Sequence, residues 1–420
     1  MNIYRRIQVK PRILVKKRRK RESYYRIFRN FANDCRLSAT PDHKNSKNKI
    51  NLKPMYQSYP CDYSLPAEWS PQSGIMLTWP HGGTDWKPYL RQITDTYLEL
   101  SEIITRYEQL LIATPIVEST RRMLASRLSK EQMDRVHLYD IDSNDTWARD
   151  HGPITLVSKN SHNGLIVPIH LLDFRFNGWG EKFAWQKDNA INLQLYYQGA
   201  FQAALENHTG FVLEGGSIES DGKGTIFTTS QCLLAPHRNQ PFTRVDIEKQ
   251  LLNFFHAKRI VWLDHGNLVG DDTDGHIDTI VRVAPHDTLL YVGCDDASDE
   301  QYADFQALEK QLKSVLTYEG YPYRLLRLPM PDPIYDDGDR LPATYANFLI
   351  INGAVIYPTY NQPEKDEEAR RQIQLAFPDR EIIGVDSRTI IRQHGSIHCL
   401  TMQLPEGTIR ETKYNNIQHR

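Results

Sequence analysis

Short apolar runs recur along most of the chain, and each follows a polar loop that is rich in glycine or aspartate. Five such segments lie near Gly74, Gly152, Gly215, Gly275 and Asn347, at intervals of about 60 to 80 residues. β-Branched and aromatic residues between turn residues are typical of short strands. The regular spacing therefore predicts an internal repeat of one small structural unit.

Turn chemistry and helical periodicity indicate what this unit contains. Asp221-Gly222 and the segment 285–287 each separate two β-rich runs and predict hairpins. Between hairpins, apolar residues recur at helical spacing in the segments 89–107, 244–255 and 299–319. Five strand–loop–strand–helix units predict an α/β fold arranged radially around a shared centre. A parallel Rossmann sheet is disfavoured, because no G-x-G-x-x-G follows a strand.

The charge of the chain is divided unevenly between its first 50 residues and the rest. The 420 residues carry 51 Lys/Arg and 52 Asp/Glu, a formal net charge of -1. Residues 1–50 hold 16 Lys/Arg against 3 acids, or +13, which leaves 35 − 49 = -14 for the remainder. An acidic body argues against a duplex nucleic-acid binder. It suits a small cationic substrate.

The N-terminal segment, residues 1–55, is predicted to be a basic, disordered extension, followed by a single domain over residues 56–420. It contains the run VKKRRKR from Val15 to Arg21. We interpret it as a solvated tail, which a start codon placed too far upstream would explain. A nuclear-localisation or nucleic-acid-binding patch is an alternative. A transit peptide is disfavoured, because Ser and Ala are scarce in it.

Cysteine usage and hydropathy bear on the compartment. The five cysteines are odd in number and form no C-x-x-C pair, which is typical of a reducing compartment. We find no apolar run of the roughly 18 residues that a membrane span needs, and no secretory h-region. We therefore expect a cytoplasmic protein without a membrane partner.

The first candidate site is the segment SNDTWARDHGP, Ser143 to Pro153. It places Trp147 and Asp150 in a loop ahead of a strand. Asn and Asp capping a turn around a buried Trp would explain the pattern structurally. A carboxylate and an aromatic ring displayed at a site would explain it functionally.

The second candidate is Glu214, which ends an apolar run and precedes two glycines in LEGGSIESDGKGT. Paired glycines allow a backbone to approach a ligand closely. A phosphate loop is disfavoured, because the order G-K-[ST] is absent. A carboxylate in an ordinary turn is the structural alternative.

The third candidate is DDTDGHID, Asp271 to Asp278. A calcium loop centred on Gly275 would need acids at positions that Gly270 and Val281 occupy, so this interpretation fails. A zinc site from His276 and Asp278 is conceivable, although their spacing is not that of a helical ligand pair. In a strand the two side chains would share one face. We expect an acid–base histidine beside a carboxylate.

The fourth candidate is Cys399 in HGSIHCLTMQLP, which we expect to lie within an apolar strand. A lone buried cysteine is usually a small hydrophobe. Here, however, a histidine and several carboxylates elsewhere in the chain could support nucleophilic chemistry. His398 should point to the opposite face of the strand, and we do not expect it to be the partner of Cys399.

These candidates fit one reaction. Carboxylates recognise the parallel N–H donors of a planar guanidinium, and the cation would favour a thiolate over a thiol. The thiolate can attack the guanidinium carbon while a histidine protonates the departing ammonia. Such chemistry needs no metal and no cofactor.

From Leu65 to Pro405 the chain resembles the agmatine deiminase / bacterial-type peptidyl-arginine deiminase family of guanidino-group-modifying enzymes. The resemblance rests on the following strings in order: LPAEWSPQSGIMLTWP, NDTWARDHGP, FVLEGGSIESDGKGTIFTTSQCLL, DDTDGHID, YANFLIINGAVIYP and GSIHC. It implies the pentein fold, a five-bladed α/β propeller with pseudo-five-fold symmetry, which agrees with the five predicted units.

The resemblance also implies roles for individual residues. Cys399 would be the nucleophile and His276 the general acid/base. Asp150 and Asp278 would hold the guanidinium, and Glu214 would orient both the histidine and the substrate. Trp147 would flank the alkyl chain of the substrate.

The resulting functional expectation is a hydrolase that converts agmatine to N-carbamoylputrescine and ammonia in putrescine biosynthesis, through a covalent Cys-thiouronium intermediate. The alternative is a peptidyl-arginine deiminase that converts C-terminal arginine to citrulline, for which Arg149 or Arg175 could bind the carboxylate. The expected partner is a small guanidino substrate. Nucleic acid is not expected to be required, and a homo-oligomer is left open.

Overall fold

The structure is a computed structural model that describes residues 63–158 and 169–410. All of these residues belong to one compact unit, Pro60–Arg420. The basic extension and its predicted boundary at residue 56 lie outside the described residues. Among the described residues, no helix combines the length and the apolar character that a bilayer span requires.

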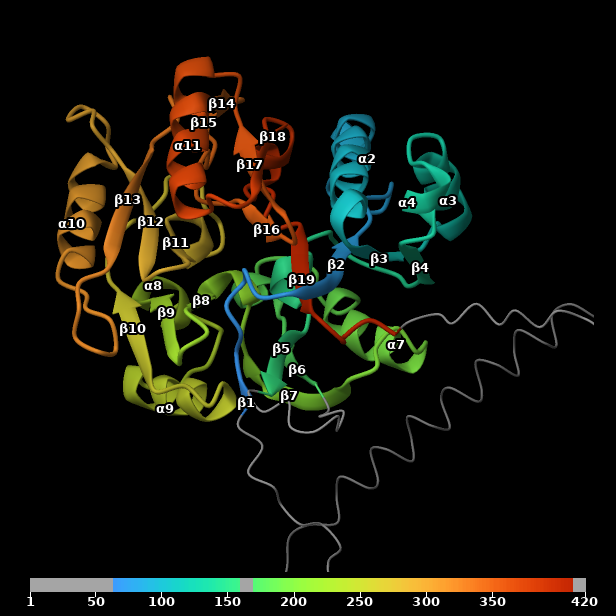
Figure 1. Ribbon diagram of the computed structural model, residues 1–420, viewed down its shortest axis with the longest axis horizontal. Coiled ribbons are helices and arrows are strands. Elements are labelled where there is room, and N and C mark those ends of the chain that lie inside the picture. Colours follow the sequence, from blue (N-terminus) through green and yellow to red (C-terminus); the bar gives the residue numbers. More distant parts are fainter. Residues whose placement is uncertain (1–62, 159–168, 411–420) are drawn as a thin grey trace, which may run out of the picture. The chain divides into compact units, whose positions relative to one another are not determined.

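The described residues form five sheets of three or four strands (Figure 1). In each sheet one central strand pairs antiparallel with one neighbour and parallel with the other. In four sheets the antiparallel pair is consecutive in sequence, and one or more helices connect it to the parallel strand. The five predicted units are therefore confirmed, together with the α/β class.

The first sheet has the order β19-β2-β3-β4 and joins the two ends of the described chain. In Figure 1, β19 (red) lies beside β2 (blue), with Thr401 opposite Leu77. Its elements are β2 (Gln72–Thr78), η1 (Lys87–Tyr89), α2 (Leu90–Tyr107), β3 (Gln109–Thr114), α3 (Val117–Ala125), α4 (Lys130–Met133), β4 (Val136–Asp140) and β19 (Thr401–Pro405).

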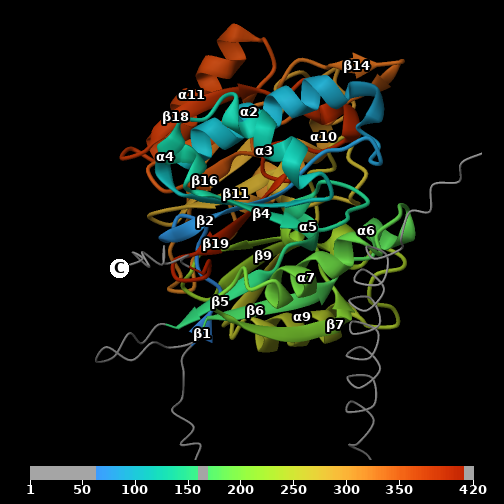
Figure 2. The same ribbon diagram turned by 90° about the vertical axis from the view of Figure 1, so that its right-hand side faces the viewer.

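The second sheet has the order β1-β5-β6-β7, and Figure 2 shows β5, β6 and β7 side by side. Its elements are β1 (Tyr63–Ser64), α5 (Ala148–His151), β5 (Ile154–Ser158), β6 (His170–Arg175), α6 (Gly178–Glu181), η2 (Asp188–Ala190), α7 (Ile191–Tyr197) and β7 (Ala204–Val212).

The three remaining large sheets have three strands each, with the orders β10-β9-β8, β11-β12-β13 and β16-β17-β18. The elements of the first are η3 (Gly215–Ser217), β8 (Ile218–Ser220), β9 (Thr225–Thr229), α8 (Ser230–Leu233), α9 (Arg244–Phe254) and β10 (Arg259–Leu263). Those of the second are η4 (Ile277–Thr279), β11 (Val281–Ala284), β12 (Thr288–Gly293), α10 (Tyr302–Leu312) and β13 (Arg324–Pro329). Those of the third are β16 (Leu349–Ile351), β17 (Ala354–Thr359), α11 (Pro363–Ala376), β18 (Glu381–Asp386) and η5 (Ile390–Gln393), and β14 (Tyr335–Asp336) pairs with β15 (Asp339–Arg340) in a small hairpin.

Apolar periodicity explains why the helices cover the sheets. In α2, the residues Ile93, Tyr97, Leu100 and Ile104 recur at helical spacing and are fully buried. The predicted helices 89–107 and 244–255 match α2 and α9 within a residue. The third ends at Leu312 and not near 319, because the N–H groups of Ser314 and Val315 donate to Gln311 O and Leu312 O in tighter turns.

Candidate active site

Asp150 lies in α5, a single helical turn that ends where Gly152 and Pro153 follow. Its side chain is buried, and each of its two carboxylate oxygens accepts a hydrogen bond from a different segment of the chain. Trp179 Nε1 donates to Oδ2 at 3.0 Å, and the backbone N–H of Gly216 donates to Oδ1 at 3.1 Å. These bonds fix the orientation of the carboxylate before any ligand arrives.

Gly216 lies where three candidate side chains converge. A Cβ at this position would lie 2.6 Å from His276 Nδ1, 2.9 Å from Asp150 Oδ1 and 3.1 Å from Asp278 Oδ2. Any residue larger than glycine would therefore push the three groups apart. The close backbone approach that the paired glycines predicted is thus made toward the candidate side chains.

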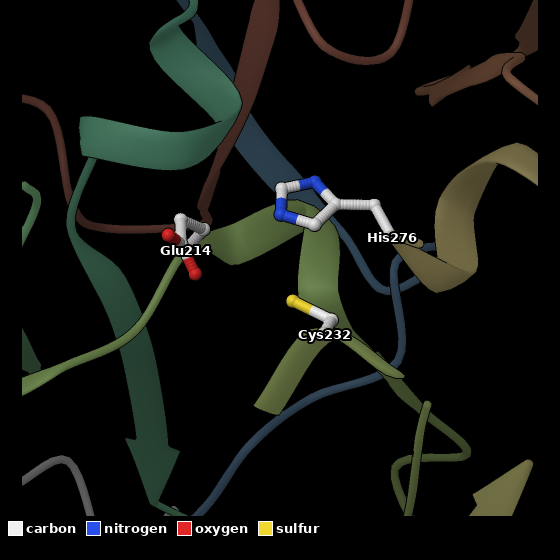
Figure 3. A group of neighbouring side chains, drawn as sticks. All are labelled: Glu214, Cys232 and His276. Atoms are coloured by element: carbon white, nitrogen blue, oxygen red, sulfur yellow. The ribbon is translucent and has the colours of Figure 1, made fainter. Parts of the chain in front are cut away.

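Glu214 is anchored beside His276 by an arginine that sequence reasoning did not find. Arg238 Nε donates to Glu214 Oε1 at 3.1 Å, and both side chains are fully buried. In Figure 3 the imidazole of His276 projects toward Glu214, and the sulfur of Cys232 lies below the ring. Donor atoms of these three residues lie within 4.8 Å of one another, but the Arg238 guanidinium already balances the Glu214 charge.

His276 is fully buried, and neither of its ring nitrogens has a hydrogen-bond partner among the described residues. Nδ1 lies 3.6 Å from Asp150 Oδ1. Burial alone would lower the histidine pKa, but the charges of Asp150 and Asp278, together with the neighbouring Cys232, raise it well above its usual value. This imidazole is therefore charged readily and is free to exchange a proton with a ligand.

The expectation that His276 and Asp278 share the face of a strand is wrong. Asp278 lies in η4, which precedes β11, and His276 immediately precedes η4. Thr279 Oγ1 donates to His276 O at 2.8 Å and closes this turn. The turn still brings both side chains to the same buried place, next to Gly216.

Cys399 lies in a turn before β19 and not within a strand, so that expectation is also wrong. Its Sγ lies 3.4 Å from Asn347 Oδ1 and 3.7 Å from Asp278 Oδ2. The backbone N–H of Cys399 also donates to Asn347 Oδ1, at 3.3 Å. Burial, together with the negative charges of Asp278 and Asp150, raises the pKa of this thiol well above its usual value.

Asp278 has two oxygens in different environments. His398 Nδ1 bonds to Oδ2 at 2.7 Å, whereas Oδ1 is buried without a partner among the described residues. Burial opposes ionisation, but the hydrogen bond and charge of His398 lower the pKa of Asp278 below its usual value. Asp278 is therefore an ionised carboxylate with one free oxygen.

A cavity of about 370 Å³ reaches Cys399. Its remaining lining is aromatic and acidic, and Arg392 and His394 are the basic residues in it. The lining comprises Asp85, Asp145, Trp147, Asp150, Trp179, Phe183, Asp272, Thr273, Arg392, Gln393, His394, Gly395 and Cys399. Of the predicted site residues, Trp147, Asp150 and Cys399 line the cavity, while His276 and Asp278 contact Asp150 and Cys399.

The ionisation of the lining carboxylates depends on their burial. Burial raises the pKa of Asp150 to about 6, although the charge of His276 opposes the shift. Burial likewise raises the pKa of Asp145 to about 7 and that of Asp272 to about 6. Near neutral pH the cavity is therefore an anionic, partly apolar site for an elongated cation.

Several residues that shape the site were not assigned a role from the sequence. Two lie between the motifs, and four lie within the motifs but were not chosen. They are Glu68, Trp179, Cys232, Arg238, Asn347 and His398.

The chain is similar to several known proteins in sequence and in fold. The profile of the family described as Porphyromonas-type peptidyl-arginine deiminase matches residues 64–405. A Marinomonas sp. (strain MWYL1) protein named "Putative agmatine deiminase" is 32% identical over 372 residues, which cover 82% of this chain and 95% of that protein.

Two solved structures share the fold. One, named "Putative Arginine Deiminase from Porphyromonas gingivalis", is 45% identical with a TM-score of 0.77, covering 83% of this chain and 100% of that one. A cysteine-to-serine variant of the C. jejuni agmatine deiminase with substrate bound is 36% identical with a TM-score of 0.75, covering 83% and 97%. The pentein fold expected from the sequence is thus confirmed.

Proposed function

Since the chain belongs to the Porphyromonas-type peptidyl-arginine deiminase family, within which it is a hydrolase of guanidino C–N bonds, we propose that its substrate is agmatine. The product would be N-carbamoylputrescine, with release of ammonia. The observation that carries this choice is the acidic cavity leading to Cys399. Four aspartates line it, and agmatine is a cation at both ends.

The guanidinium end of agmatine fits the inner part of the cavity. Asp150 and the free Oδ1 of Asp278 offer carboxylate oxygens to its N–H donors. Trp147 and Trp179 supply an apolar wall for the butyl chain. Asp85, Asp145 and Asp272 would then attract the terminal ammonium.

The arginines that a substrate carboxylate would need are engaged elsewhere. Arg149 is buried against Glu68, and Arg175 stacks on Trp185 at 5.1 Å. Neither arginine is among the described residues that line the cavity at Cys399. Arg392 does line it, but Asp336 holds its guanidinium through two hydrogen bonds of 2.8 and 3.0 Å. This arrangement favours agmatine over a C-terminal arginine.

Binding of the cation would prepare the nucleophile. The pKa of the Cys399 thiol is high because burial and two carboxylates disfavour a further negative charge. A guanidinium held by Asp150 and Asp278 neutralises those charges, so the thiolate becomes accessible when substrate is present. Substrate binding and nucleophile activation would thus be coupled.

The first chemical step forms the covalent intermediate. The thiolate of Cys399 adds to the guanidinium carbon and forms a C–S bond. Protonated His276 gives its proton to one amino group, the C–N bond breaks, and ammonia leaves. A cationic S-alkylthiouronium on Cys399 and a neutral His276 remain.

The second step restores the enzyme. Neutral His276 takes a proton from water, and the hydroxide adds to the thiouronium carbon. The C–S bond then breaks, which returns the thiolate and leaves a ureido group, and the remaining water proton converts ammonia to ammonium. Glu214, fixed by Arg238, would hold His276 in place through both steps.

We extend the proposal to the setting of the reaction. The ureido amine product places the enzyme in putrescine biosynthesis. Residues 56–420 would form the single catalytic domain, acting in the cytoplasm without a nucleic-acid or membrane partner. The basic extension, residues 1–55, would take no part in catalysis, so its removal should leave kcat/KM unchanged.

The test is to supply agmatine, free arginine and a peptide with C-terminal arginine, and to measure ammonia and ureido product. We expect the highest kcat/KM with agmatine. Preference for the peptide would instead support the peptidyl-arginine deiminase alternative. Absence of product from all three substrates would refute the proposed function.

A further inference from the structure

A chain of hydrogen bonds leads away from Asp278 on the side opposite to its free oxygen. His398 Nδ1 bonds to Asp278 Oδ2 at 2.7 Å, and His398 Nε2 bonds to Glu68 Oε1 at 2.8 Å. The three residues are remote in sequence and lie in three separate turns. His398 is thereby held between two carboxylates.

The surroundings of His398 determine its charge. Its side chain is fully buried, and both of its ring nitrogens face oxygens of carboxylates that accept when ionised. Both nitrogens can donate at once only when the ring is an imidazolium, so this geometry favours the cation, flanked by two negative charges. Burying a charged group is costly unless it is paired and hydrogen-bonded, and His398 has a carboxylate partner on each ring nitrogen.

Glu68 is itself fixed on its far side by two arginines. Arg149 Nη1 lies 3.1 Å from Oε1, and Arg282 Nη2 lies 2.5 Å from Oε2. Arg282 also binds Glu219 Oε1 at 2.6 Å. The donor atoms of Glu68, Glu219 and His398 are close enough to hold a metal ion, but the two guanidinium groups already compensate these carboxylates.

Glu68 also reaches a second cavity. This cavity, of about 70 Å³, is lined by Glu68, Arg149 and Gln403 and shares no lining residue with the cavity at Cys399. The Glu68 side chain is 16% exposed, whereas His398 and Asp278 are at 0%. These hydrogen bonds thus connect the buried carboxylate of Asp278 to the partly exposed carboxylate of Glu68.

We propose that His398, held as a cation by Glu68, is a positioning residue that keeps Asp278 ionised and turns its free oxygen toward the guanidinium. The proposal rests on the proposed function, because it assigns Asp278 to the substrate. It adds that the adjacent His398 and Cys399 both approach Oδ2 of Asp278, which leaves Oδ1 for the guanidinium. Glu68 would favour the ionised form of Asp278 without contacting the substrate.

The charged groups that face Asp278 come from several elements, and the test has to separate them. They are His276 beside η4, Asp150 in α5, Arg282 in β11, and His398 and Cys399 in the turn before β19. Among these, His398 alone bonds directly to an oxygen of Asp278 with a nitrogen donor.

The first experiment compares His398→Asn with His398→Gln. The amide nitrogen of asparagine can replace Nδ1 and keep the bond to Asp278, whereas that of glutamine can replace only Nε2. We expect kcat/KM for agmatine to be at least about tenfold lower in His398→Gln than in His398→Asn. Equal losses in two variants with equal melting temperatures would overturn the positioning role.

The second experiment compares Glu68→Gln with Glu219→Gln. Both changes remove one carboxylate partner of Arg282, but only Glu68 bonds to His398. Glu68→Gln keeps an acceptor but weakens the cation on His398, and Asp278 then becomes easier to protonate. Protonation of Asp278 steepens the decline of kcat/KM below the acid limb that Asp150 sets at about pH 6. We expect this second, lower limb to move to higher pH by about one unit in Glu68→Gln, with a smaller shift in Glu219→Gln.

A third readout separates failure of this inference from failure of the proposed function. 2-Chloroacetamidine carries a cationic amidinium and alkylates a nearby thiol without turnover, so its rate also depends on ionised Asp278. If wild-type protein does not hydrolyse agmatine, the proposed function fails, and the alkylation profile still tests His398. If the lower acid limb of alkylation, which reports Asp278, is unchanged in Glu68→Gln, the proposed effect of Glu68 on Asp278 through His398 is overturned.

Discussion

His276 Nδ1 lies 3.6 Å from Asp150 Oδ1, and both side chains are buried. The contact joins the proposed acid–base group to a proposed guanidinium clamp, and each changes the ionisation of the other. The carboxylate raises the pKa of the histidine, while the histidine opposes the rise that burial causes in the pKa of Asp150. The pH dependence of activity follows from this pair.

Activity should decline on the acid side of about pH 6. Burial raises the pKa of Asp150 to about 6, so below that pH the carboxyl is increasingly protonated and cannot hold a cation. We expect kcat/KM for agmatine to fall by up to about tenfold per pH unit below this point. The measurement is initial rates between pH 5 and pH 8, and a flat profile would contradict the assignment.

Replacing Cys399 by alanine should remove turnover. The C–S bond of the proposed intermediate cannot form, so we expect kcat to drop by about 10⁴-fold or more. Cys294→Ser serves as the control, because Cys294 is also a free buried thiol but does not line the cavity at Cys399. Ammonia release checks both variants, and substantial activity in Cys399→Ala would remove the nucleophile role.

Asp150→Asn should weaken both guanidinium binding and turnover. A hydrogen bond between charged groups contributes roughly 1.5–3 kcal/mol, so kcat/KM should fall by about 10- to 150-fold. Trp179→Phe is the graded comparison, because it removes one donor to Asp150 and leaves the carboxylate charged. Its loss should be smaller, and an equal or greater loss would indicate that Asp150 acts mainly through packing.

The carboxylates Asp85 and Asp272 should recognise the far end of agmatine. Partly exposed ion pairs contribute about 0.2–1 kcal/mol, so Asp272→Asn and Asp85→Asn should each raise KM by up to about fivefold. Butylguanidine lacks the terminal ammonium and is the matched control substrate. Its KM should not change in either variant. Equal effects on both substrates would argue against an ammonium site.

Gly216→Ala should disrupt the site while leaving the fold largely intact. The added Cβ would come within 3.1 Å of each of His276, Asp150 and Asp278. We expect kcat/KM to fall by at least about 10²-fold, because small displacements of catalytic groups are costly. At Gly210 a Cβ meets no atom within 4 Å, so Gly210→Ala should retain activity at a similar melting temperature.

The sequence predicted the units of the fold because local signals agreed along each unit. Glycine turns, apolar runs and helical periodicity all pointed to the same elements, as in α2 and α9. The end of α10 was missed because apolar residues continue at Val315 and Leu316, although Gly320, with a positive φ, marks the turn that follows. Pairing of β19 with β2 was equally invisible, since the two strands are far apart in sequence.

The candidate site was predicted only where residues lie within recognisable motifs. Alternation along a strand was the wrong argument for both His276 and Cys399, because each lies in a turn where side-chain direction does not alternate. Arg238 and Glu68 were missed since their roles arise from long-range pairing with Glu214 and His398. Such pairs leave no trace in the spacing of one sequence.

The pairing of β19 with β2 also bears on the synthesis of the protein. Cys399 immediately precedes β19, and β2 is among the first described strands to leave the ribosome. The sheet on which Cys399 depends therefore cannot be completed until translation has passed Pro405. A nascent or truncated polypeptide that lacks β19 would hold the carboxylates and imidazole of the site without the Cys399 thiol, so reactivity toward a guanidine would appear only in molecules that contain β19.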